Sequence, residues 1–392
     1  MTLSLELYRS VGRYLAARAV GPRLPGLLAG PLSPLRLVDA SPRPLPGEGW
    51  VRVRPILAGI CGSDLNTLSA RSSLYFSALV SMPFVPGHEV VGELLDDVGD
   101  LARGQRVVLD PVLACAARGI SPSCEPCQAG TIGLCDRVAA GHLKAGLQTG
   151  YCADTGGGWS QMMLAHRSQL HPVPDELPNA AAVMVEPMAC ALHTVRRATV
   201  PRDATVLIVG AGTVGLLVLV ALAASAPPGR VIVVAKHAPQ AALARVLGAT
   251  EVIPTEEALG AVRRATRSFR LTPEHCAPFL LGGADVSFEC AGSSGALDLA
   301  LRATRGGGTV MLAGMPAAAD LSPAWFRELE LRGAYSGCGS FEEAIELAGA
   351  RGLENFVSGI YPLGRWHEAI DHAMSAGRLG GVKVAFEPRQ EN

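Results

Sequence analysis

An apolar run passes directly into a glycine-rich turn in Val206-Leu207-Ile208-Val209-Gly210-Ala211-Gly212-Thr213-Val214-Gly215. This apolar run predicts a buried strand, and the G-x-G-x-x-G that follows opens a helix expected over 213–224. The first glycine permits the tight turn, the second lets the backbone approach a pyrophosphate, and the third allows the helix to pack closely on the strand. Because the helix N-terminus adds N–H donors, the stretch predicts a dinucleotide site. The alternative is an ordinary tight turn between a strand and a helix.

The surrounding sequence repeats the same alternation of strand and helix. Further strands are predicted over 231–234, 251–253, 285–288, 309–312 and 331–335, and a helix over 239–247. Six largely apolar strands interleaved with helices imply a parallel sheet that is covered on both faces.

The residues after the second of these strands bear on the choice of dinucleotide. An acid about 20 residues after the glycines would bind both ribose hydroxyls of NAD. The sequence instead has Ala235, followed by Lys236 and His237. Two potential cations and no carboxylate favour NADP over NAD. The alternative is that Lys236 is only a solvated surface charge.

The part of the chain before about residue 186 has a different character. Short strands are predicted over 51–54, 90–91 and 107–109, and the segment 113–151 is rich in Cys, Gly and Ser without sustained periodicity. It contains Cys124-x2-Cys127-x7-Cys135, with Cys115 upstream. Four thiolates around a tetrahedral ion would form a closed structural zinc site in a lobe that lacks a core of its own. The alternative, that the cysteines are buried small hydrophobes, fits poorly with so few apolar neighbours.

A second set of candidate ligands is dispersed along the chain. Cys61 lies in Gly59-Ile60-Cys61-Gly62-Ser63-Asp64, and His88 and Glu89 lie in Gly87-His88-Glu89-Val90-Val91-Gly92. Glu186 could add an oxygen ligand. Three protein ligands and an exchangeable position describe a catalytic zinc, although spacing along the sequence does not by itself join these residues.

Composition limits the class of protein. The 392 residues are 49% hydrophobic and 18% charged, which indicates a sizeable core and about two domains. Lys and Arg number 34 against 35 Asp and Glu, so the chain lacks the basic excess of a nucleic-acid binder. No secretory signal or membrane-spanning run is evident, and we expect a cytoplasmic protein with reduced thiols.

In their order along the chain, these motifs resemble the zinc-dependent medium-chain alcohol and polyol dehydrogenases. The resemblance spans about residues 14–388 and includes Glu186-Pro187 and the terminal strand around Lys383. It implies an α/β protein with two domains. A GroES-like β-rich catalytic domain would cover 1–188 and 338–392, with a structural-zinc lobe at about 113–140. A doubly wound Rossmann domain with a six-stranded parallel sheet would cover 189–337. Residues before about 13 have no counterpart in the family.

The resemblance also implies roles for the residues. Cys61 and His88 match the inner zinc ligands, and Glu89 matches an acid that either binds the zinc or sits just behind it. Glu186 takes the fourth position, acting directly or through a bound water. Ser63 would accept the substrate proton and Asp64 would orient His88. Cys190 would lie beside the nicotinamide, or would serve only in packing. The expected cofactor contacts are Gly210, Gly212, Thr213, Val214, Gly215, Ala235, Lys236, His237 and Gly314.

Three features depart from the family pattern. Asn66 occupies the position where many members end their proton relay in a histidine, and Asn66 cannot titrate. Strict cysteine spacing would place the first structural ligand at Ser121, so we expect Cys115 to take that role after a short insertion. The acid typical of NAD binding is missing.

Trp159 could line the substrate cleft, or pack in the core.

The predicted activity is hydride transfer between an alcohol and a nicotinamide cofactor. The alcohol is expected to be a secondary alcohol or a polyol, and the enzyme is expected to hold one catalytic and one structural zinc. The expected partners are a small-molecule alcohol or carbonyl and further copies of the chain in a homodimer or homotetramer; neither nucleic acid nor membrane is expected. Two alternatives remain open at this point: a zinc-independent reductase of activated double bonds, and a non-catalytic cofactor-binding protein of the same fold.

Overall fold

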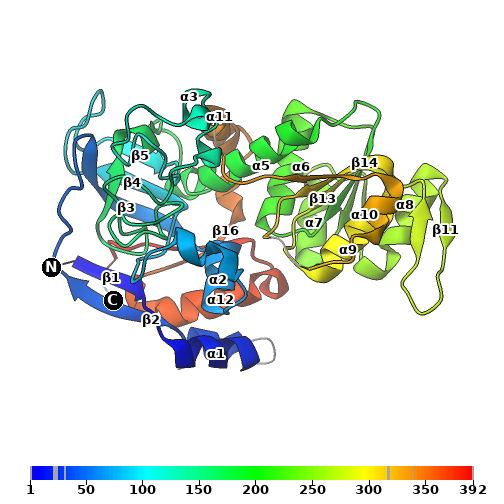
Figure 1. Cartoon of the computed structure of the whole chain (residues 1–392), viewed down its shortest axis with the longest axis horizontal. Helices are drawn as coiled ribbons and strands as arrows, with labels where there is room; N and C mark the ends of the chain where they lie inside the picture. The colour runs from blue at the N-terminus through cyan, green and yellow to red at the C-terminus, as the bar shows by residue number, and fades with distance from the viewer. Residues whose placement is uncertain (1, 21–24, 31, 316–317, 338, 391–392) are drawn as a thin grey trace. The chain divides into compact units, whose positions relative to one another are not determined.

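A computed structural model of the chain divides into two compact units (Figure 1). It describes all residues except 1, 21–24, 31, 316–317, 338 and 391–392. The first unit comprises residues 1–186, 338–376 and 383–392, and the second comprises 187–337 and 377–382. The stretch 377–382 groups with the second unit because the Thr213 hydroxyl donates to the Val382 carbonyl, at 3.0 Å.

The second unit is built on a six-stranded, fully parallel sheet in the order β10-β9-β8-β13-β14-β15. Its central strands β8, β9 and β13 are almost entirely buried, as expected of a parallel sheet covered on both faces, whereas the edge strand β15 is largely exposed. Strand order reverses between β8 and β13, and such a switch point is where open α/β sheets bind ligands. The strands are β8 (Thr205–Val209), β9 (Arg230–Val234), β10 (Glu251–Ile253), β13 (Ala284–Glu289), β14 (Thr304–Leu312) and β15 (Glu330–Gly333).

Helices lie on both sides of this sheet (Figure 1). Helix α6 is apolar all round, and every residue from 215 to 222 is buried. A short hairpin of β11 (Phe269–Leu271) and β12 (Phe279–Leu281), absent from the sequence prediction, precedes β13. The helices of the unit are α6 (Thr213–Ser225), α7 (Ala238–Val246), η5 (Thr255–Glu257), α8 (Ala258–Thr266), α9 (Ser294–Ala303) and α10 (Ser322–Arg327). The predicted doubly wound α/β architecture is therefore confirmed.

The first unit is β-rich, as predicted. A sheet in the order β16-β17-β3-β4-β5-β7 is joined by β6, which pairs with β3. All its pairings are antiparallel except that of β16 with β17. The strands are β3 (Trp50–Gly59), β4 (Val90–Leu94), β5 (Arg106–Leu109), β6 (Met163–His166), β7 (Leu170–Pro172), β16 (Val357–Tyr361) and β17 (Lys383–Phe386).

The N-terminal residues are integrated into the first unit. Strand β1 (Thr2–Leu7) pairs antiparallel with β2 (Leu35–Ala40), and helix α1 (Val11–Val20) and the turn η1 (Pro25–Ala29) lie between them in sequence. The backbone N–H groups of Leu5 and Leu7 donate to the carbonyls of Trp159 and Phe84, respectively. Both leucines are buried in the core of the unit.

The remaining elements of the first unit are short. Helix α5 (Val185–Ala198) begins in the first unit and continues into the second, and α12 (Trp366–Leu379) also crosses the boundary. In the described part of the chain, we find no helix that combines the length and apolar character needed to span a membrane. The other helices are α2 (Gly62–Leu68), η2 (Leu74–Leu79), α3 (Glu125–Gln128), η3 (Ile132–Leu134), η4 (Arg167–Gln169), α4 (Asn179–Ala182), α11 (Phe341–Ala350), η6 (Leu353–Phe356) and η7 (Leu363–Arg365).

Candidate metal and cofactor sites

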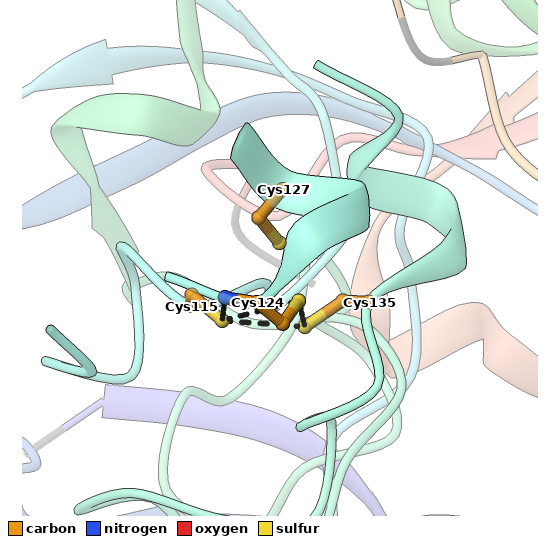
Figure 2. A group of neighbouring side chains, drawn as sticks. All are labelled: Cys115, Cys124, Cys127 and Cys135. Carbon is orange, nitrogen blue, oxygen red and sulfur yellow. Dashed lines mark hydrogen bonds between the residues drawn. The ribbon is translucent and has the colours of Figure 1, made fainter. Parts of the chain in front are cut away.

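The four cysteines of the predicted lobe converge on one point (Figure 2). The Sγ atoms of Cys115, Cys124 and Cys135 lie 3.6–3.8 Å apart, and with the Sγ of Cys127 all four lie within 4.8 Å of one another. The cluster includes Cys115, whereas Ser121 is exposed. Four sulfurs at these separations suit the corners of a tetrahedron around a zinc ion.

The backbone of the lobe favours thiolates at this point. The N–H groups of Cys124 and Arg137 donate to the sulfurs of Cys115 and Cys135, each at 3.4 Å. Burial opposes ionisation of Cys124, but hydrogen bonds from the backbone of Cys127 and Asp136 lower its pKa to about 6, whereas burial raises the pKa of Cys127 and Cys135. The donor set and its surroundings therefore fit a metal ion.

A buried arginine that the sequence analysis missed connects the lobe internally. The Arg118 side chain is fully buried, and its guanidinium donates to the carbonyls of Leu113, Ala140 and Gly146 at 2.8, 2.8 and 2.6 Å. One cation thus satisfies carbonyls from both ends of a loop that has few apolar residues. No spacing in the sequence distinguishes this arginine from those on the surface.

The second set of candidate ligands surrounds the start of helix α2. Cys61 is the N-cap residue of α2, and its backbone N–H donates to Asp64 Oδ2 at 3.0 Å. The same carboxylate lies 3.6 Å from His88 Nδ1, measured from Asp64 Oδ1. Asp64 therefore fixes both the turn that carries the thiol and one side of the imidazole, as expected of a residue that orients a metal ligand.

The imidazole of His88 is buried between these groups. Its Nδ1 atom is buried and forms no hydrogen bond among the described residues, and its Nε2 atom lies 3.5 Å from Ser63 Oγ. Burial would lower the pKa of His88, but the charge of Asp64 raises it, and so do the Cys61 thiol and the Glu186 charge, so that the pKa lies well above its usual range. Cys61 and Glu186 are thus near enough to the imidazole to act on its charge, but their ligand atoms do not form a compact cluster with it.

Glu89 is engaged elsewhere. Both of its carboxylate oxygens lie 2.6 Å from Lys383 Nζ, and both side chains are almost completely buried. A Cβ atom on Gly59 would collide with Glu89 Oε2, so the carboxylate occupies space that only glycine leaves. The sequence predicts a terminal strand around Lys383 but does not show its partner. A lone lysine within the apolar run Val382–Phe386 is the feature that could have indicated a buried, paired lysine.

The two constellations differ in compactness. Among the described residues, the four cysteines are the only group of three or more His, Cys, Asp or Glu side chains whose ligand atoms all lie within 4.8 Å. The set around His88 is therefore more open. A thiolate, an imidazole and a carboxylate nevertheless form a donor set that suits a catalytic zinc.

The glycine-rich turn of the second unit has the geometry expected of a dinucleotide site. Gly210 has a φ of +108°, and a Cβ on Gly215 would collide with the Gly210 carbonyl, so both positions require glycine. Among the described residues other than its chain neighbours, no atom lies within 4 Å of a Cβ built on Gly212, the N-cap of α6, which leaves space for a phosphate. Thr213 and Val214 form the first turn of α6.

The residues after β9 lie beside the same edge of the sheet. Ala235 is buried and its N–H donates to the Ile253 carbonyl, while Lys236 is exposed and His237 is half-buried. Gly314 follows β14, and its N–H donates to the Glu289 carbonyl at 2.8 Å. The Glu289 carboxylate, which the sequence analysis missed, accepts the N–H groups of Ala291 and Gly292 and so orders the loop after β13.

Three other residues singled out in the sequence have clear locations. Trp159 is fully buried, donates from Nε1 to the Gly59 carbonyl and packs edge-on against Phe386, so it lies in the core. Asn66 lies in α2 and is half-buried. Cys190 lies in α5, in the second unit, where its Thr194 neighbour donates a hydroxyl hydrogen bond to its carbonyl.

Comparison with known proteins assigns the family. Residues 47–175 match the alcohol dehydrogenase GroES-like domain, and residues 213–350 match the zinc-binding dehydrogenase domain. The sorbitol dehydrogenase of Arabidopsis thaliana is 30% identical over 74% of this chain and 75% of its own length. The L-idonate 5-dehydrogenase of Vitis vinifera is 29% identical over 77% and 78%.

Solved structures agree with this assignment. A protein of Sinorhizobium meliloti 1021, assigned as a zinc-binding dehydrogenase and crystallised with NADP, superposes with a TM-score of 0.71. It is 26% identical, and the match covers 99% of both chains. The chain therefore belongs to the zinc-dependent medium-chain alcohol dehydrogenase family and is an oxidoreductase of CH–OH groups.

Proposed function

We propose that this enzyme oxidises a secondary hydroxyl of a polyol or a related sugar acid, with NADP as the cofactor and zinc bound by Cys61, His88 and Glu186. The observation that carries the proposal is the geometry around the buried His88 imidazole: Asp64 Oδ1 lies 3.6 Å from its Nδ1, and the other oxygen of the same carboxylate accepts the backbone N–H of Cys61. The named substrates of the relatives, sorbitol and L-idonate, are polyhydroxylated chains, which supports the substrate class.

The metal and the residues around it would have different roles in the reaction. Zinc held by these ligands would supply a Lewis acid that polarises the substrate oxygen. Ser63, whose Oγ lies 3.5 Å from His88 Nε2, is placed to accept the hydroxyl proton. The Asp64 carboxylate lies against the Nδ1 side of His88, so Nε2 is the ring nitrogen left to bind the metal.

A chain of hydroxyl groups provides a route for the proton beyond Ser63. The Tyr151 hydroxyl is near Ser63, donates to Asp64 Oδ1 at 3.5 Å and lies 3.3 Å from Thr67 Oγ1, which in turn lies 3.1 Å from Ser72 Oγ. Ser72 is half-buried, so this chain leads outward from the site. Because Asn66 cannot titrate, we propose that these hydroxyls pass the proton that a histidine passes in other members.

The preference for NADP rests on the end of β9. Ala235 presents no carboxylate to repel a 2′-phosphate, and Lys236 is exposed beside it. The Sinorhizobium protein, which is similar along its whole length, was crystallised with NADP.

The experiment that tests the proposal is a cofactor-reduction screen with NADP⁺ and NAD⁺ over primary alcohols, secondary alcohols and polyols, with zinc quantified in the same sample. We expect turnover of polyols with NADP⁺. A Cys61→Ser variant should lose the inner zinc and turnover while it keeps the zinc of the cysteine cluster. Full zinc content and activity in that variant would refute the assignment.

A further inference from the structure

The fully buried guanidinium of Arg118 forms five hydrogen bonds, and among the described residues all of them go to backbone carbonyls. One acceptor, the Leu113 carbonyl at 2.8 Å, precedes the cysteine cluster in the chain. The other four follow the cluster and are the carbonyls of Ala140, Leu143, Lys144 and Gly146, at 2.8, 3.3, 3.3 and 2.6 Å. Because a charged donor away from water is costly to leave unpaired, we expect Arg118 to hold these carbonyls firmly.

The segment that Arg118 holds, residues 140–146, lies outside the loop that a metal ion in the cysteine cluster would close. The last cysteine of the cluster is Cys135, and this held segment comes after it. The cluster therefore closes the loop 115–135, whereas Arg118 closes the larger loop 113–146 that encloses it. The two closures are made by different groups, so either one can be removed without the other.

The held segment lies against the loop that carries Tyr151. A Cβ atom on Gly146 would collide with the Cβ of Cys152, the residue that follows Tyr151, so the two backbones pack closely. The Cys152 thiol also donates to the Lys144 carbonyl at 3.6 Å, and Arg118 donates to the same carbonyl. The held segment and the Tyr151 loop are thus connected at two points.

Tyr151 is buried, and its hydroxyl is fixed beside the candidate catalytic residues. It donates to Asp64 Oδ1 at 3.5 Å and lies 3.3 Å from Thr67 Oγ1. Its ring packs on that of Phe84, with the ring centroids 5.2 Å apart. In the proposed reaction this hydroxyl belongs to the proton route. A shift of its loop would therefore lengthen these contacts and slow turnover without removing a group that contacts substrate.

We propose that Arg118 is a positioning residue: by fixing the held segment it keeps the Tyr151 hydroxyl against Asp64 and Thr67, and it does so without the metal of the cysteine cluster. This inference rests on the proposed function, because that function gives the Tyr151 hydroxyl its role. It predicts that loss of the guanidinium frees the held segment and lowers kcat, whereas loss of the cluster's metal leaves the held segment in place.

Lys144 provides a local probe of the held segment. The sequence has three lysines, of which Lys144 and Lys236 are exposed and Lys383 is buried. Endoproteinase Lys-C cleaves after lysine, so it reports on the bond whose carbonyl Arg118 holds. Cleavage after Lys236, in the second unit, is the internal reference. The full-length protein is digested under native conditions, and the ratio of the two cleavage rates is followed by mass spectrometry.

We expect Arg118→Met to raise the ratio of cleavage after Lys144 to cleavage after Lys236 by roughly tenfold, because cleavage of a folded chain follows the population of its open form. Cys124→Ser should leave the ratio at the wild-type value although the cluster loses its metal. The matched control is Arg137→Met, which removes an exposed arginine of the same lobe and should also leave the ratio unchanged. An unchanged ratio in Arg118→Met, or an equal rise in Cys124→Ser, would overturn the inference.

A double-mutant cycle with Tyr151→Phe separates positioning from general damage to the lobe. The values of kcat and KM are measured with NADP⁺ and a polyol for the wild type, the two single variants and the double variant. Each single variant should lower kcat by roughly tenfold with little change in KM, and Arg118→Met should have little further effect in the Tyr151→Phe protein. Additive losses, or an unchanged kcat in Arg118→Met, would show that Arg118 does not act through Tyr151 and would overturn the inference.

A milder variant guards against misfolding. If Arg118→Met does not fold, Arg118→Gln retains two N–H donors for the same carbonyls and should raise the cleavage ratio by roughly threefold. An unchanged ratio in Arg118→Gln would overturn the inference. If the wild-type protein turns over no polyol, the proposed function fails instead, and the cleavage ratio decides alone whether Arg118 fixes the held segment. The two failures are therefore distinguishable.

Discussion

A buried carboxylate outside the metal sites gives a quantitative test of the structure. Asp110 follows β5 and is 3% exposed. The hydrogen bond that its carboxylate accepts, from the Val112 N–H at 3.1 Å, does not replace the water lost on burial. Burial therefore raises the pKa of Asp110 to about 6, against the opposing effect of the Val112 hydrogen bond. In the unfolded chain the group titrates near its ordinary value of 3.8.

The sign of the effect on stability follows from proton uptake. Between pH 3.8 and 6 the folded state binds more protons at this site than the unfolded state, so the contribution of Asp110 to stability falls as pH rises through this window and is constant above it. A difference of 2.2 pKa units corresponds to about 3 kcal/mol at pH 8. At pH 5 the same pKa values leave about half of that penalty.

Asp110→Asn should therefore stabilise the first unit by up to about 3 kcal/mol at pH 8 and by about half as much at pH 5, because the amide keeps an acceptor for Val112 without the charge. Urea unfolding followed by tryptophan fluorescence measures this. Trp50, Trp159 and Trp366 are buried in the first unit, whereas Trp325 is 84% exposed in the second, so the signal reports mainly on the first unit.

Asp100→Asn is the matched control. The Asp100 carboxylate is exposed and accepts two hydrogen bonds from Arg167, which lower its pKa. Its removal should give no stabilisation at pH 8. The reasoning is refuted if Asp110→Asn is no more stable than the wild type at pH 8, or if its gain is the same at both pH values.

Three further predictions concern the sites. Cys124→Ser should remove the zinc of the cysteine cluster while cofactor binding persists. The lobe should then be cleaved near residue 130 at a protease concentration roughly tenfold lower than the wild type requires. An unchanged digestion pattern would contradict a structural role for this zinc. Ala235→Asp should raise KM for NADP⁺ by roughly tenfold or more and lower that for NAD⁺, since the carboxylate repels a 2′-phosphate; steady-state kinetics with both cofactors decide this. Thr67→Val should reduce kcat by roughly tenfold with little change in KM, because it interrupts the hydroxyl chain from Ser63; an unchanged kcat with NADP⁺ and a polyol would exclude that route.

The doubly wound sheet could be predicted because its signals are local. Buried parallel strands are continuous apolar runs, so Val206–Val209 and Val231–Val234 are recognisable in the sequence, and the structure extends each by one residue at its start. The turn between β8 and α6 can be recognised in the same way, because the glycines that its backbone requires all lie within six consecutive residues.

Long-range contacts explain what the sequence did not reveal. Strand β1 pairs with β2, about 30 residues away, and the N–H groups of Leu5 and Leu7 also bond to Trp159 and Phe84, which lie far along the chain. The hairpin of β11 and β12 has three-residue strands, too short to give a periodic signal. The partner of Glu89 is 294 residues away, so a single sequence could not show which carboxylate carries a counter-ion.

The place of β17 in its sheet has a consequence for biosynthesis. Although β17 is synthesised after every other strand of its sheet, it lies between β16 and β3 and pairs Ala385 with Gly59. Until β17 is made, β16 and β3 lack the strand that lies between them, and Glu89 lacks its partner Lys383. The nucleotide-binding sheet, whose strands end at residue 333, has all its parts earlier. Translation thus completes the sheet of the second unit before it completes the sheet of the first unit, although most of the first unit is synthesised earlier.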